Sequence, residues 1–108
     1  MSGALAGLLT ERVTIERRGG ARDALGGAVG DWNAIGVRWA RLEPRGYGPL
    51  IVGEALDARP RWRVTLRGQS GVAVGDRLLW RGRTMIVRGV MDDPATPDRT
   101  LFEAEEER

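Results

Sequence analysis

The sequence of 108 residues contains no cysteine, no histidine and no lysine. The absence of cysteine excludes disulfide bonds and thiolate metal sites. The serines are Ser2 and Ser70, and without histidine or lysine neither has an ordinary general base to activate it. Ser70 lies in a Gly-Gln-Ser-Gly stretch that is typical of a turn. The composition therefore argues against an enzyme.

Sites for phosphate groups, metal ions and membranes are also missing from the sequence. No glycine-rich segment ends in the Lys-Ser or Lys-Thr of a phosphate-binding loop. Asp92, Asp93 and Asp98 lie close together, but the prolines between them indicate a solvated turn rather than a calcium loop. No apolar run approaches the roughly 20 residues that cross a bilayer. We expect no cofactor, no metal ion and no membrane contact.

The charges nearly balance, because 17 arginines face 15 acidic residues and the net charge is +2. Arg61, Arg63 and Arg67 line one face of a predicted strand, and the chain ends in the acidic segment 103–107. The arginines suit either a phosphate-binding stripe or a strand face paired with acidic neighbours. The near-neutral net charge favours the second interpretation. We expect at least one Arg–Glu pair between the two segments, within or across subunits.

Alternation of polar and apolar residues predicts β-strands. It is unbroken over residues 61–67, where Trp62, Val64 and Leu66 share one face. Further strands are expected at residues 12–16, 37–42, 77–80, 83–90 and 100–104, with the third and fourth of these joined in a hairpin. About five to six short strands with Gly/Pro turns predict one all-β domain over residues 1–108, a small barrel or sandwich.

The tryptophans differ in their expected surroundings. Trp62 lies on the apolar face of its strand and should pack in the core. Trp39 and Val37 lie opposite Ala40 and Leu42, so this strand should be covered on both sides. Trp32, which follows a glycine-rich loop, is the best candidate for an exposed ring that faces a partner.

The connection over residues 45–59 is too long for an ordinary hairpin, which needs about two to five residues. It contains glycines that can act as hinges and the apolar run at residues 50–52, which is unfavourable in water. A loop of this length in a small domain is usually functional.

The order of these segments resembles the phage head–tail joining proteins, also called head–tail adaptors, stoppers or head-closure proteins. The resemblance is carried by segments spread over nearly the whole chain: residues 9–17, 22–27 ahead of Trp32, 37–44, 61–67 and 81–87. The family often has tyrosine where Leu25 stands, and a more polar segment at residues 47–52.

The resemblance implies a small β-barrel-like virion protein of a tailed phage or a phage-derived gene transfer agent, assembled in the bacterial cytoplasm. Copies would form a homo-oligomeric ring in the neck, with the portal and adaptor ring above and the tail terminator or tail tube below. The ring would close the DNA-filled head, dock the tail and let DNA pass without sequence-specific binding. Two alternatives stay open: a tail terminator or minor tail ring protein, and a small β-barrel that binds nucleic acid.

Two sets of residues follow from this interpretation as hypotheses. The first would line the channel of the ring, with carboxylates that repel the DNA phosphates: Tyr47, Leu50, Ile51, Val52, Glu54 and Asp57. The equally simple alternative is a loop on the outside that contacts the adaptor ring. The second set would form the contact between subunits: Trp32, Arg61, Arg63, Arg67, Glu103 and Glu105.

Overall fold

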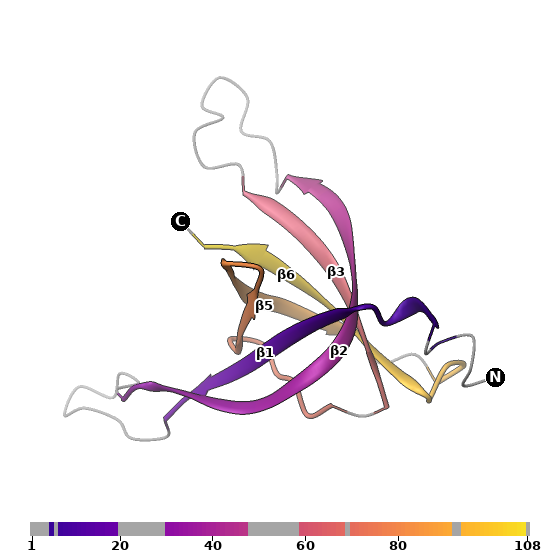
Figure 1. Cartoon of the computed structure of the whole chain (residues 1–108), viewed down its shortest axis with the longest axis horizontal. Helices are drawn as coiled ribbons and strands as arrows, with labels where there is room; N and C mark the ends of the chain where they lie inside the picture. Colours follow the sequence, from indigo (N-terminus) through magenta and orange to yellow (C-terminus); the bar gives the residue numbers. More distant parts are fainter. Residues whose placement is uncertain are drawn as a thin grey trace.

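The computed structural model describes residues 5, 7–19, 30–47, 59–68, 70–91 and 94–107, with the backbone alone at Tyr47. The strands are β1 (Glu11–Arg18), β2 (Trp32–Tyr47), β3 (Pro60–Arg67), β4 (Arg77–Trp80), β5 (Arg83–Met91) and β6 (Arg99–Glu106). They close into an antiparallel barrel in the order β1-β2-β3-β6-β5-β4 (Figure 1). The all-β prediction is confirmed, and the barrel is selected over the sandwich.

Every predicted strand is present, and β4 has the predicted bounds. β2 departs most from expectation, because it covers 16 residues and extends to Tyr47. It pairs with β1 up to Ala40 and with β3 from Ala40 onward, so one strand serves two neighbours around the barrel. The register shifts between Pro44 and Tyr47, which accommodates a proline within the strand. Residues 45–47, expected in the long connection, therefore belong to the sheet.

The core consists of the inward-facing side chains of all six strands. Val13 and Ile15 of β1 are buried, as their alternation predicts, and so are Val64 and Leu66 of β3. Phe102 of β6 is among the largest fully buried side chains. The other buried members of the cluster are Ala40, Val72, Leu78, Trp80, Met85, Val87 and Ala104.

One end of the barrel is closed by two tryptophans. The rings of Trp62 and Trp80 meet edge to face, with centroids 5.0 Å apart. The Trp62 Nε1–H donates to Glu106 Oε2 at 2.8 Å, and the Trp80 Nε1–H donates to Glu11 Oε1 at 3.0 Å. Arg83 lies over both rings and pairs with Glu106 at 2.7 Å. The core role predicted for Trp62 is confirmed.

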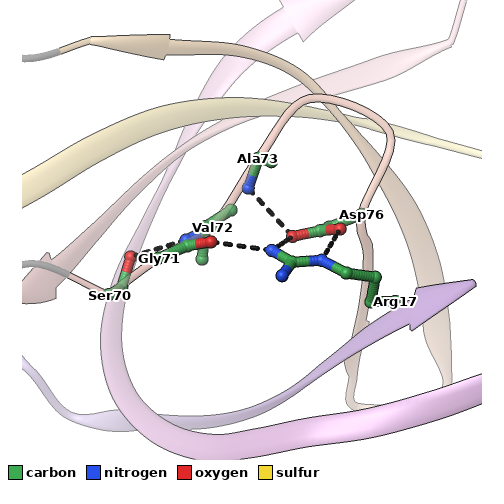
Figure 2. Close-up of polar contacts among 6 residues, drawn as sticks. All are labelled: Arg17, Ser70, Gly71, Val72, Ala73 and Asp76. Carbon is green, nitrogen blue, oxygen red and sulfur yellow. Dashed lines mark hydrogen bonds and ion pairs between the residues drawn. The ribbon is translucent and has the colours of Figure 1, made fainter. Parts of the chain in front are cut away.

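The segment that leads into β4 is held by an ion pair between Arg17 of β1 and Asp76 (Figure 2). Arg17 donates from Nε to Asp76 Oδ1 at 3.0 Å and from Nη2 to Oδ2 at 2.8 Å. The same Nη2 donates to the Gly71 carbonyl oxygen at 2.7 Å, and the Ala73 N–H donates to Asp76 Oδ2 at 2.9 Å. Asp76 is 4% exposed, and its hydrogen bond raises the pKa of Arg17. A buried carboxylate thus fixes residues 71–76 against β1.

Candidate functional site

The predicted channel loop is largely outside the described residues, which is where Leu50, Ile51, Val52, Glu54 and Asp57 lie. Both ends of the loop are described. Tyr47 of β2 pairs with Pro60 of β3, so the two strands are still paired, after a shift in register, where the loop begins and ends. The loop therefore leaves the barrel from a paired strand end.

A cleft of about 250 Å³ lies at the base of this loop. Its lining comes from the strand ends and from the tryptophan-closed end of the barrel: Pro44, Gly46, Pro60, Arg61, Trp62 and Arg83. Gly46 has a positive φ of 81°, a conformation that glycine adopts without strain. The loop thus starts beside a rigid, hydrogen-bonded aromatic cluster.

The outer face of β3 and β6 brings the predicted arginines and glutamates together. Arg61 pairs with Glu105 at 3.3 Å and with Glu103 at 4.0 Å. The expected Arg–Glu pair is therefore present, and it forms within one chain. Arg63 lies directly opposite Glu103 on β6 and Glu43 on β2. Opposite charges therefore surround Arg61 and Arg63, whereas Arg67, at the other end of β3, lies opposite Arg99.

Arg63 has one feature that the sequence does not reveal. Its Nε is buried and has no hydrogen-bond partner among the described residues. Its cross-strand neighbours, Glu43 and Glu103, carry charges of the opposite sign. A small rotation of either carboxylate, or a partner's acceptor, would satisfy this atom. No measured contact makes this face a subunit interface, so that role stays a prediction.

In the single chain Trp32 is less exposed, and Trp39 more exposed, than the sequence suggests, and the partner-facing role of Trp32 stays a prediction. Trp32 is half-buried, and the guanidinium groups of Arg18 and Arg77 lie 5.0 and 4.4 Å from its ring centroid. Trp39 is half-exposed, with Arg12 stacked 4.7 Å from its ring centroid. The expected cover over Val37 and Trp39 is not supplied by the part of the chain that the structure describes.

Two further properties of the described residues concern metal ligands and membrane-spanning helices. These residues contain no cluster of three or more carboxylates that could hold a metal ion. Asp92 and Asp93 lie outside them. Within the described ranges, no helix is long and apolar enough to span a bilayer.

Comparison with known protein families identifies the family to which this barrel belongs. The sequence matches the family described as phage head completion protein over residues 5–107. The chain belongs to the phage head completion protein family. Family membership places it among the structural proteins of phage heads and indicates a structural role. The resemblance to head–tail joining proteins is thereby confirmed.

Two solved structures share the fold of this head completion protein. The first is a chain in the "Virion of native gene transfer agent (GTA) particle", with a TM-score of 0.73 and 23% identity over 93% of this chain and 96% of that one. The second is protein SF1141 from Shigella flexneri 2a, with a TM-score of 0.65 and 20% identity over 93% and 94%. At these identities the likeness establishes the fold. The curated proteins include no significant match.

The charge pairs on the outer face of this head completion protein should contribute little to its stability. We expect Arg61→Ala to lower the free energy of unfolding by only about 0.5–1 kcal/mol, because the pair is partly exposed to solvent. Urea unfolding followed by tryptophan fluorescence measures the change. Arg41→Ala removes a more exposed pair with Glu43 and should have no measurable effect. A larger loss for Arg41→Ala than for Arg61→Ala would contradict this ranking.

Proposed function

We propose that this head completion protein forms a homo-oligomeric ring at the head–tail connector, below the portal and adaptor. The ring closes the DNA-filled head, offers a docking surface for the tail and lets DNA pass through its centre. The observation that carries the proposal is the family match over residues 5–107. The site of action is the neck of a virion that assembles in the bacterial cytoplasm, and the role requires no catalysis.

The charge distribution supports a structural ring over a nucleic-acid-binding barrel. A phosphate-binding stripe would need arginines that are free to meet the DNA backbone. Arg61 instead pairs with Glu103 and Glu105, and Arg63 lies between two glutamates. The net charge of +2 gives little long-range attraction for DNA. Weak DNA binding suits a passage through which DNA must slide.

The long loop is the part of the proposed ring that would narrow the channel. Its ends leave the barrel next to the Trp62–Trp80 pair, which provides a rigid base. Glu54 and Asp57 would repel the DNA phosphates, and the apolar run at residues 50–52 would contact the same loop of neighbouring subunits. If the glycines of the loop act as hinges, as the sequence suggests, the loop could serve as a gate that opens for DNA.

Deleting the gene tests the proposal. Cells that lack this protein should accumulate heads and free tails that do not join, and the heads should lose their DNA. Negative-stain electron microscopy and nuclease protection of the packaged DNA measure both effects. A plasmid copy of the gene should restore joined particles. Tailed, infectious particles from the deletion strain would exclude a head-closing role.

A further inference from the structure

The outer surface of β2 carries a stripe of apolar side chains that the described chain leaves about half exposed. Ile35 is 45% exposed, Val37 is 52% exposed and Trp39 is 51% exposed. Single exposed apolar residues are common, but three within five positions of one strand form a continuous patch. Such a patch marks a surface that is covered in the assembled state.

The same stretch of β2 has an open backbone edge. Residues 32–40 pair with β1 on one side, whereas pairing with β3 on the other side begins only at Ala40. Residues 32–39 therefore lack a strand partner on that side among the described residues. We call residues 32–39 the β2 edge.

A second open edge lies on β5. β4 pairs with β5 only as far as Ile86, and the segment before β4 bonds to Val87. On the opposite side, β5 pairs with β6 as far as Met91. Residues 88–91, here called the β5 edge, thus lack a described partner on the β4 side. Val90 is 39% exposed and Met91 is 41% exposed.

The two edges lie on opposite flanks of the barrel. In Figure 1 the β1–β2 ribbon extends to the left, and the turn that joins β5 to β6 lies at the right. A contact between two different patches of identical subunits is heterologous, and such contacts form a ring when the rotation between neighbouring subunits closes. One chain therefore presents both halves of a head-to-tail joint.

Neither edge is blocked by lysine, proline or an unpaired charge, although the β5 edge is short and has a register shift between Val87 and Gly89. Free edges are usually blocked by lysine, proline or an uncompensated charge. Residues 32–39 and 88–91 contain no lysine or proline, and each has one arginine. Arg38 donates to the Arg67 carbonyl oxygen at 2.7 Å, and Arg88 pairs with Glu105 at 3.4 Å. Both charges are thus engaged within the chain.

We infer that the β2 edge of one subunit pairs with the β5 edge of a second copy, so that the sheet continues from barrel to barrel around the ring. The apolar side chains of both edges cover the joint. This inference rests on the proposed ring and names its subunit contact. The β5 edge contributes only residues 88–91, so the contact buries less surface than the roughly 800 Å² per partner of a stable dimer. Each contact is weak alone and becomes stable through ring closure.

The absence of cysteine makes cross-linking a clean test. The double variant Val37→Cys/Val90→Cys places one thiol at each edge. A short bismaleimide should convert the purified protein, at high concentration, into a ladder of dimers, trimers and larger species. Mixing the two single variants should give one dimer band only, because each has a single reactive edge. The control is Val37→Cys/Val74→Cys, since Val74 is 64% exposed and lies on neither edge.

The outcomes separate the inference from the proposed function. The control should give no ladder, and circular dichroism should confirm that every variant is folded. No ladder from the edge pair, or an equal ladder from the control, overturns the inference. Strong self-cross-linking of Val37→Cys alone would mean a two-fold contact and would also overturn it. The deletion phenotype tests the head-closing role independently. If the ladder forms but the deletion strain still makes infectious particles, the edge contact stands and only the proposed function is wrong.

Discussion

Replacing Asp76 with alanine is expected to lower the free energy of unfolding by about 2–3 kcal/mol, because the Asp76 carboxylate accepts several hydrogen bonds that are all lost together. Asp76 is buried and accepts from Arg17 and from the Ala73 N–H. Its loss would leave the Ala73 N–H without this acceptor, and among the side-chain bonds from Arg17 only the one to the Gly71 carbonyl oxygen would still hold the segment before β4. Because Arg17 is half-exposed, water can solvate its guanidinium, which keeps the loss below that of a fully buried pair.

Chemical denaturation followed by tryptophan fluorescence measures this loss. Asp76→Asn keeps an oxygen acceptor for Ala73 but removes the charge that faces Arg17, so we expect an intermediate loss. Asp98→Ala is the matched control, because Asp98 also pairs with an arginine, Arg99, but is exposed. Its midpoint of unfolding should stay at the wild-type value. Wild-type stability of Asp76→Ala would show that the ion pair does not hold this segment.

The Arg17–Asp76 pair also shows what the sequence cannot reveal. The two residues are 59 positions apart, and no local pattern connects them. The strands themselves were predictable because a side-chain period of two is a local signal, visible in each segment alone. Residues 61–67 are the clearest case, since Val64 and Leu66 are fully buried as their alternation requires. Local periodicity thus predicts elements, but not the contacts between them.

The ends of β2 show a second limit of sequence patterns. Pro44 and Gly46 normally interrupt strands, so residues 45–47 were assigned to the loop. The strand accommodates both through the register shift before Tyr47, and pairing resumes at Pro60. Strands tolerate proline at an edge or at a bulge, but a position can be recognised as an edge or a bulge only once its partner strand is known. The boundary of the long loop therefore had to come from the structure.

The exposed residues gave the least reliable predictions. Apolar residues on both faces of β2 indicated burial on both sides, and Val37 and Trp39 are instead about half-exposed in the single chain. The pattern of the sequence reflects all the contacts that a protein makes, including those with other subunits. Arg61 and Glu105 pair within the chain, and the subunit contact expected of them stays a prediction. Sequence alone does not separate internal from intersubunit partners.

Shortening the long loop is expected to abolish head closure while preserving the barrel. Since Tyr47 and Pro60 form a cross-strand pair, residues 48–59 can be replaced by Asn-Gly, together with Pro60→Thr, which supplies the backbone N–H that closes a two-residue hairpin turn. The variant should keep its β circular-dichroism spectrum, because the buried core lies in the strands. If the loop closes the channel, particles with this variant should lose packaged DNA, and the infectious titre should fall to the level of the deletion strain.

A second variant distinguishes the charge of the loop from its bulk. Glu54→Gln/Asp57→Asn keeps the loop length but removes the carboxylates proposed to repel DNA phosphates. We expect closed heads that retain DNA but eject it more slowly. Without the carboxylates the channel wall repels the phosphates less, so the DNA can stick to the wall as it passes. DNA release is triggered in purified particles, and a fluorescent dye that binds DNA measures its rate.

If the shortened loop gives full titre, the loop has no part in closure. If it gives closed heads that lack tails, the loop faces outward as a docking element.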